Sequence, residues 1–124
     1  MPDPSPNPIL IVDDDQPTQQ LLMALMRRNG FKTIVASNGA EAIAALGSTT
    51  ISVIILDLMM PSVDGQAVIN FLTREKMNVP VIICTAAGPK RTDEITSDVV
   101  KAVLRKPFDI DLLNDMVTTL AAGR

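Results

Sequence analysis

Short hydrophobic runs alternate with longer segments of helical periodicity along most of this chain. The runs are rich in Ile, Val and Leu, and each predicts a strand. They cover residues 9–12, 32–36, 51–56, 80–84 and 102–105. The 51–56 run has Ser52 as its one polar residue, so it has no polar side to turn toward water, and we expect such strands to be buried on both faces.

Between the strands, hydrophobic residues recur at the spacing of three and four that marks an amphipathic helix. The predicted helices cover residues 16–29, a segment ending near Gly47, residues 66–76, a weaker and more polar segment 91–100, and residues 110–121. Ser37 or Asn38 can cap the second helix, and Gly30 can close the first. The residues expected to face the core are Leu21, Leu22, Leu25, Met26, Ala42, Ile43, Leu46, Val68, Ile69, Leu72, Leu113, Met116, Val117 and Leu120.

The order of elements is a strand followed by a helix, five times over. Buried strands linked by helices predict an α/β fold in which a five-stranded parallel sheet carries helices on both faces. The 124 residues suit one such domain, expected over residues 9–122. Residues 1–8 include four prolines and predict a flexible N-terminal tail.

Composition narrows the class of protein. The net charge of −3 argues against direct nucleic-acid binding, and no hydrophobic run is long enough to span a bilayer. The Pro-rich start does not resemble a secretory signal, and the single Cys84 cannot form an internal disulfide, so we expect a cytoplasmic protein without membrane insertion. The absence of histidine excludes a phosphohistidine carrier or a histidine-based catalytic triad within this chain.

Charged and polar residues follow the strands where the carboxyl ends of a parallel sheet meet, which is where such sheets bind ligands. In chain order they are Asp13, Asp14, Asp15, Asp57, Thr85 and Lys106. At about 5 Å and an effective dielectric constant of about 20, each pair of carboxylates repels by about 3 kcal/mol. Lys106 offers one balancing charge, and Mg2+ offers two and accepts oxygen ligands. Alternatively, acidic residues here cap the following helix, as we expect of Asp15.

Four short motifs, each at the end of a predicted strand, resemble the receiver domain of bacterial response regulators over about residues 9–121. The motifs are residues 11–15, residues 57–61 with Asp64 and Gly65, Thr85 with Ala86, and residues 106–108. The resemblance is to chemotaxis-regulator-like members. It implies a doubly wound, flavodoxin-like (βα)5 fold with strand order 2-1-3-4-5.

The same resemblance implies a function in a two-component system. A sensor histidine kinase or phosphotransfer protein would phosphorylate Asp57 in a Mg2+-dependent reaction. The signal would pass to an unknown downstream protein through the face formed by the fourth helix, the fifth strand and the fifth helix. Apart from phosphorylating itself and slowly losing the phosphoryl group, the chain is not expected to be an enzyme.

Each motif residue receives a role from this resemblance. Lys106 would pair with a phosphoryl oxygen, and Thr85 would donate its hydroxyl to the phosphoryl group. The residues expected to hold Mg2+ are Asp57, Asp14, Asp13 through a water, and the backbone carbonyl of Met59. The residues expected to contact the phosphoryl group through their backbones are Met59 and Ala86.

Two features differ from the usual family pattern or affect its chemistry. Val103 stands where an aromatic ring usually reports phosphorylation by rotating, and a valine cannot do this. Met59 and Ala87 would flank the path of the hydrolytic water, and neither side chain can bind that water, which predicts slow self-dephosphorylation.

Two other functions fit parts of the sequence. A receiver fold used only as a binding scaffold is favoured by Val103 and the weak fourth helix, but disfavoured by the complete set of acidic, threonine and lysine residues. A Mg2+-dependent phosphatase with an aspartyl-phosphate intermediate would use the spacing of Asp13 and Asp15. The chain leaves no room for the cap domain of such enzymes.

Overall fold

The protein is an α/β domain with one parallel sheet. The computed structural model describes residues 7–57, 65–86, 98–106 and 109–122. The strands are β1 (Ile9–Val12), β2 (Thr33–Ala36), β3 (Val53–Leu56), β4 (Val81–Thr85) and β5 (Val100–Arg105), and the helices are α1 (Gln16–Arg28), α2 (Gly39–Ser48), α3 (Gly65–Arg74) and α5 (Ile110–Ala121). The strands lie in the order β2-β1-β3-β4-β5, which confirms the predicted flavodoxin-like topology.

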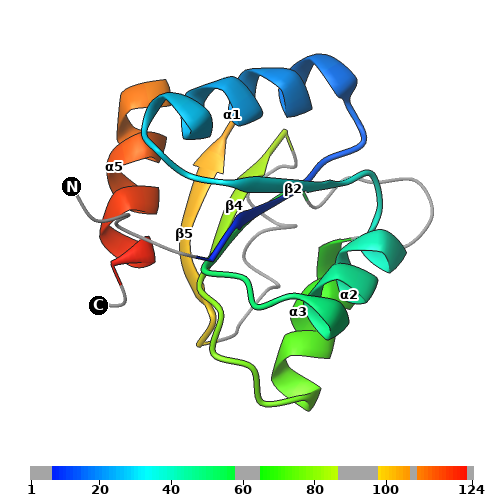
Figure 1. Cartoon of the computed structure of the whole chain (residues 1–124). Coiled ribbons are helices and arrows are strands. Elements are labelled where there is room, and N and C mark those ends of the chain that lie inside the picture. Colours follow the sequence, from blue (N-terminus) through cyan, green and yellow to red (C-terminus); the bar gives the residue numbers. More distant parts are fainter. Residues whose placement is uncertain (1–6, 58–64, 87–97, 107–108, 123–124) are drawn as a thin grey trace.

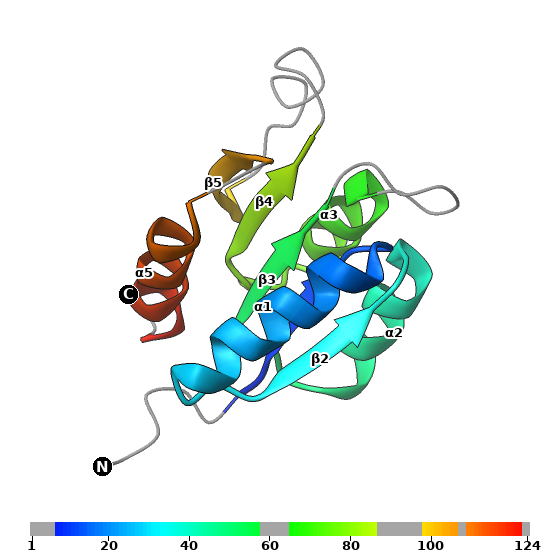
Figure 2. The ribbon, with the colours of Figure 1, turned by 90° about the horizontal axis from the view of Figure 1, so that it is seen from above.

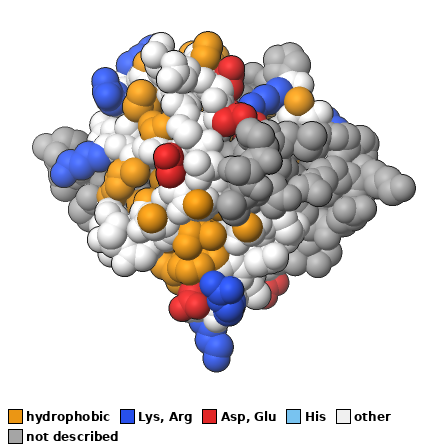
Figure 3. All heavy atoms as spheres, turned by 90° about the vertical axis from the view of Figure 1, so that its right-hand side faces the viewer, with side chains coloured by type: hydrophobic (Ala, Val, Ile, Leu, Met, Phe, Trp, Pro, Cys, Tyr) orange, Lys and Arg blue, Asp and Glu red, His pale blue; other side chains and the backbone are white. Residues whose placement is uncertain are grey.

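Helices cover both faces of the sheet. α1 and α5 lie on one face, and α2 and α3 lie on the other (Figures 1 and 2). One hydrophobic cluster joins Leu22 of α1 and Leu113 of α5 to the first face, and a second joins Leu46 of α2 and Leu72 of α3 to the opposite face. Figure 3 views the side that carries α2 and α3, where hydrophobic side chains lie among charged ones.

The central strands are buried on both faces, as their continuous hydrophobic sequences predict. Every residue of β1, β3 and β4 is buried, whereas β5, at one edge of the sheet, alternates between half-buried and exposed residues. Side chains of β1 alternate between the two clusters, with Ile11 in one and Val12 in the other. The sheet is therefore the buried central layer of the domain, and its carboxyl edge is available to carry a site.

Short polar side chains define where the helices begin. Asp15, Asn38 and Asp109 are the N-caps of α1, α2 and α5, and each side chain accepts hydrogen bonds from backbone N–H groups of the first turn. Of the two predicted caps for α2, the structure thus uses Asn38. Gly30 follows α1 with φ of +86°, a left-handed conformation that a glycine adopts at little cost.

Some sequence expectations were wrong in detail. Leu21 was expected in the core but is 47 % exposed, because α1 turns Gln19, Leu22 and Met26 toward the sheet. Val100 was expected to end a helix but is the first residue of β5, and residues 91–97 of that predicted helix lie outside the described residues. Of the residues expected in the core, Leu25, Ile43, Met116 and Leu120 are only partly buried.

Residues 1–6 of the predicted tail lie outside the described part of the chain. Asn7 and Pro8 are described, and the Ser52 hydroxyl donates to the Asn7 carbonyl over 2.9 Å. None of the described helices is long and hydrophobic enough to cross a membrane.

Candidate functional site

The parallel register brings the acidic residues to the same edge of the sheet. Val12 of β1 is paired with Leu56 of β3, so Asp13 and Asp57 follow neighbouring strands at the same level. The backbone N–H of Asp57 donates to the Val12 carbonyl over 2.9 Å, which extends the ladder by one residue. Asp13 and Asp57 therefore lie side by side because of strand pairing, although they are far apart in the sequence.

Three carboxylates form a cluster at this edge. Asp13, Asp14 and Asp57 each place a carboxylate oxygen within 4.8 Å of the others. Asp13 is 2 % exposed and Asp57 is 6 % exposed, whereas Asp14 faces solvent. A set of carboxylate oxygens with one open side suits a hard divalent cation such as Mg2+, which prefers oxygen ligands and retains waters.

Lys106 reaches this cluster from the end of β5. Its backbone N–H donates to the Thr85 carbonyl over 3.0 Å, which keeps Lys106 beside the end of β4. Its ammonium nitrogen donates to Oδ2 of Asp13 over 2.9 Å and to Oδ2 of Asp57 over 3.3 Å. The side chain thus bridges the two buried carboxylates.

Thr85 contacts the remaining oxygen of Asp57. It is the last residue of β4 and is fully buried, and its hydroxyl donates to Oδ1 of Asp57 over 3.0 Å. Each oxygen of the Asp57 carboxylate therefore has its own donor, a hydroxyl on Oδ1 and an ammonium on Oδ2.

Burial and charge act against each other at this site. Burial raises the pKa of Asp13, although hydrogen bonds from Lys106 and from the backbone of Asp15 oppose that change. Burial alone would lower the pKa of Lys106, but its hydrogen bond to Asp13 and the charges of Asp13 and Asp57 together raise it. Lys106 is therefore held as a cation, while one ammonium does not fully offset the cost of burying Asp13.

Asp15 has a separate role from its two neighbours. Its carboxylate accepts hydrogen bonds from the hydroxyl and the backbone N–H of Thr18, and these bonds lower the pKa of Asp15. This confirms the expectation that Asp15 caps α1. It also means that Asp13 and Asp15 do not form a joint carboxylate pair of the kind the phosphatase alternative requires.

Gln19 is a buried residue near the site that the sequence analysis missed. Its side-chain amide donates to the backbone carbonyl of Asp13 and to the Ser37 hydroxyl. A glutamine in the first turns of a helix usually faces solvent. The signal available in the sequence was its spacing of three and seven from Leu22 and Met26, which places all three on one face of α1.

The contacts given above do not include the other residues predicted to belong to the site. Met59 lies outside the described residues, as do Ala87 and the proline and phenylalanine after Lys106. Ala86 follows β4 and is exposed. Val103 is paired with Ile83 on β4 and is 42 % exposed.

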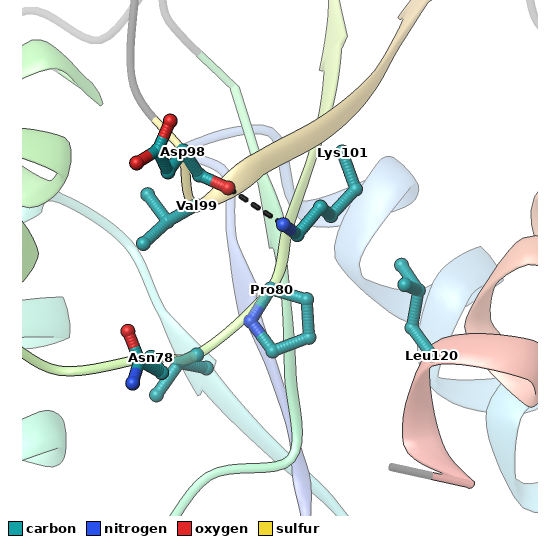
Figure 4. A pocket seen from close by; sticks show the side chains of 7 residues that line it. Asn78, Pro80, Asp98, Val99, Lys101 and Leu120 are labelled. Carbon is teal, nitrogen blue, oxygen red and sulfur yellow. Dashed lines mark hydrogen bonds between the residues drawn. The ribbon is translucent and has the colours of Figure 1, made fainter. Parts of the chain in front are cut away.

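The described part of the chain also has a pocket of about 300 Å3 at the opposite edge of the sheet. Its lining includes Pro80 and Val99, which precede β4 and β5, and Leu120 near the end of α5 (Figure 4). The ammonium of Lys101 donates to the Asp98 carbonyl over 2.7 Å rather than to a carboxylate. The cluster around Asp57 is therefore the better candidate for chemistry.

A doubly wound parallel sheet with this acidic cluster, lysine and threonine at its carboxyl edge defines a receiver-type signalling domain. Residues 9–118 match the family model of the response regulator receiver domain, and the chain belongs to that family. Receiver domains of this family are signalling domains of two-component systems, not classical enzymes.

Several known proteins are similar to this chain. The transcriptional activator protein PfeR of Pseudomonas aeruginosa is 35 % identical over 109 residues, which are 86 % of this chain and 35 % of that protein. Protein PetR of Rhodobacter capsulatus is 39 % identical over 87 residues, covering 70 % of this chain and 36 % of that protein. The chain thus spans about a third of the length of these relatives.

Solved structures share the fold over nearly the whole chain. The Francisella response regulator 1452 receiver domain superposes with a TM-score of 0.84 at 33 % identity, covering 93 % of this chain and 96 % of that chain. The response regulator TrrA of Thermotoga maritima, solved in complex with Mg2+ and BeF, has a TM-score of 0.81 at 30 % identity, covering 92 % of this chain and 98 % of that chain.

Proposed function

We propose that this domain accepts a phosphoryl group on Asp57 from a sensor histidine kinase or a phosphotransfer protein, in a reaction that depends on Mg2+. The observation that carries the proposal is the arrangement around Asp57. One oxygen of its buried carboxylate accepts a hydrogen bond from the Thr85 hydroxyl, and the other accepts one from the Lys106 ammonium. Carboxylate oxygens of Asp13 and Asp14 lie within 4.8 Å. A similar receiver solved with Mg2+ and BeF supports the choice of ion.

In this reaction an oxygen of Asp57 attacks the phosphorus atom. The bond from phosphorus to the donor nitrogen breaks, the electron pair stays on that nitrogen, and an aspartyl phosphate forms. The distance of 3.3 Å between the Lys106 ammonium and Oδ2 of Asp57 supports the proposal that this ammonium pairs with a phosphoryl oxygen. Mg2+ supplies positive charge that offsets the charges of the carboxylate and the phosphoryl group.

The residues proposed to hold Mg2+ differ in how they are placed. Asp57 and the exposed Asp14 would coordinate it directly, and the buried Asp13, already bonded to Lys106, would do so through a water. The backbone carbonyl of Met59 completes the proposed set. Three ionised carboxylates against one ammonium leave two negative charges in the cluster, which one Mg2+ would balance.

Thr85 is the proposed sensor of the modification. Its hydroxyl now donates to Oδ1 of Asp57, and a phosphoryl group on Asp57 offers it a more highly charged acceptor. The amide of Ala86 would help to bind the same group. Thr85 belongs to β4 and is paired with Arg105 of β5. A movement of Thr85 would therefore shift β5, which is part of the proposed output face together with α5.

The partner that receives the signal is proposed to be another protein. The net charge of −3 does not favour direct contact with nucleic acid, although the relative PfeR is named a transcriptional activator. Val103 cannot act as a rotating ring, so the proposed signal does not depend on the movement of an aromatic side chain at that position. A cytoplasmic location fits a kinase donor and is part of the proposal.

Mass spectrometry of the intact protein tests the acceptor. Incubation with acetyl phosphate and Mg2+ should add one phosphoryl group, and a chelator should prevent the addition. Asp57→Asn should abolish labelling, whereas the matched control Asp115→Asn, on the exposed side of α5, should be labelled like the wild type. Equal labelling of Asp57→Asn would place the acceptor elsewhere, and unchanged labelling in a chelator would remove the role of Mg2+.

A further inference from the structure

Gln19 has an unusual environment for a helix residue close to a site. It is 8 % exposed, and its amide nitrogen donates both to the Asp13 carbonyl and to the Ser37 hydroxyl, the latter over 3.2 Å. Because a carbonyl oxygen can only accept hydrogen bonds, the amide group must turn its nitrogen toward Asp13. The orientation of this side chain is therefore determined by its partners.

The two hydrogen bonds link Gln19 to the ends of both β1 and β2. Ser37 is itself held, because its backbone N–H donates to the Glu41 carboxylate of α2 over 2.6 Å. The Asp13 backbone N–H donates to the Ala36 carbonyl over 3.1 Å. Gln19 thus links α1 to the ends of β1 and β2, which are already joined to each other and to α2 by hydrogen bonds.

The carbonyl that Gln19 binds belongs to the peptide group between Asp13 and Asp14. A peptide group is planar, so a fixed carbonyl direction also fixes the direction of the Asp14 N–H. The Asp13 carboxylate is positioned separately, by the Asp15 backbone N–H and by Lys106, each over 2.9 Å. The exposed Asp14 side chain depends on the peptide group before it for its direction toward the cluster.

We propose that Gln19 is a positioning residue for the Mg2+ site: it fixes the Asp13–Asp14 peptide group and thereby aims the Asp14 carboxylate at the ion. The inference rests on the proposed function, since it requires Mg2+ to bind the cluster. Groups that orient metal ligands typically change metal affinity about 10- to 100-fold when they are removed. A side chain that only stabilises the fold would change the unfolding temperature and leave the affinity for Mg2+ unaltered.

Gln19→Met tests the role, because methionine has nearly the same shape and no donor. A matched control is Ser52→Ala, which removes a hydroxyl that donates to the Asn7 and Pro8 carbonyls at the opposite end of the sheet. For each variant, Mg2+ titration gives a dissociation constant, and thermal unfolding in a chelator gives the stability. We expect Gln19→Met to bind Mg2+ about tenfold more weakly, and Ser52→Ala to keep the wild-type affinity even if it unfolds earlier.

A second variant keeps the test decisive if Gln19→Met does not fold. Ser37→Ala changes an exposed residue and removes one of the two acceptors that orient the Gln19 amide. We expect its Mg2+ affinity to be weaker than that of the wild type. Wild-type affinity in a folded Gln19→Met, or in Ser37→Ala if that variant alone folds, would overturn the inference.

The two proposals fail in different ways. If the wild type binds Mg2+ and is phosphorylated on Asp57 while Gln19→Met binds Mg2+ equally well, the positioning role is wrong and the proposed function stands. If the wild type itself binds no Mg2+ and accepts no phosphoryl group, the proposed function is wrong and the positioning role fails with it.

Discussion

Asp13 shows how a residue of the site can act against the stability of the fold. Its carboxylate is almost fully buried, and burial raises its pKa despite the hydrogen bond from Lys106. The ionised form is therefore less favourable in the folded protein than in water. A buried carboxylate that favours cation binding therefore lowers the stability of the protein when no cation is bound.

Asp13→Asn should raise the unfolding temperature at pH 7 in a chelator, because it removes a buried charge. The folded-state pKa of Asp13 lies above its ordinary value of 3.8, so the folded protein holds this proton more tightly than the unfolded chain. The contribution of Asp13 to the free energy of unfolding is therefore largest at low pH, and it is lost as pH rises through 3.8 toward the folded-state pKa. The advantage of Asp13→Asn should shrink as pH falls through the same range.

Thermal unfolding at several pH values, with and without Mg2+, checks this expectation. Mg2+ should stabilise the wild type more than it stabilises Asp13→Asn, since the ion relieves the repulsion that the variant lacks. A lower unfolding temperature for Asp13→Asn in the chelator would mean that the bond from Lys106 outweighs the cost of burial.

Met59 is the residue expected to control the lifetime of the phosphorylated state. Its side chain cannot bind or activate a water molecule, and a positioned acid or base is worth about 10²- to 10⁴-fold in rate where one is present. We expect slow loss of the phosphoryl group from the wild type and faster loss from Met59→Asn. The measurement is the decay of phosphorylated protein after removal of the donor. Equal decay in both would show that the side chain at position 59 does not govern access of water.

Among the elements, local sequence determines where the helices begin and end, whereas packing against the core determines which face of each helix is buried. Helix α5 covers Ile110–Ala121, the same residues that its hydrophobic spacing predicts. Its cap, Asp109, accepts from two backbone N–H groups of the first turn. By contrast, the exposure of Leu21 on α1 came from the direction in which the helix packs, which its spacing alone did not decide.

Asn38 offers a test of helix capping, since its side chain accepts from the Glu41 backbone N–H over 2.8 Å. Asn38→Ala should destabilise the domain by about 1 kcal/mol, because it leaves a first-turn N–H of α2 without this acceptor. Chemical denaturation with a shared slope gives the difference in unfolding free energy. The control Asn70→Ala makes the same change at an exposed position inside α3, where alanine favours helix, and should cost little or nothing. Equal losses in both variants would contradict a capping role for Asn38.

At the scale of the whole molecule, the site depends on the complete sheet. Lys106 and Asp13 are 93 residues apart in the sequence, and their contact requires β5, β4, β3 and β1 to be in register. The acidic cluster therefore exists only in the folded domain. Any loss of strand order would separate the ammonium from the carboxylates that it neutralises.

Cys84 reports on the integrity of that sheet. It lies in β4 between β3 and β5, it is 1 % exposed, and burial raises the pKa of its thiol to about 12. Since the thiolate is the reactive form, the native protein should react with a thiol reagent at pH 8 only as fast as the sheet opens. Spectrophotometric titration should find one reactive thiol after denaturation. Rapid reaction of the native protein would contradict the buried position of β4.

Local sequence determined much of the fold. Continuous hydrophobic runs predicted buried strands, and the alternation with helices predicted a parallel sheet, because both signals depend on residues close together in the chain. The same logic found Asp13, Asp14, Asp57, Thr85 and Lys106, since each follows a predicted strand. The first strand was predicted with the observed boundaries, each of the other four differs by one or two residues at one end or at both, and Val100 was assigned to a helix although it lies in β5.

Tertiary structure decided the features that depend on distant residues. The sequence did not show that each oxygen of Asp57 has a different donor. It also did not reveal Gln19, because a buried glutamine is stabilised only by acceptors that the sheet brings to it, here the Asp13 carbonyl and the Ser37 hydroxyl. Hydrophobic spacing is a property of one element, whereas hydrogen-bond partners come from several, so only the assembled fold determines them.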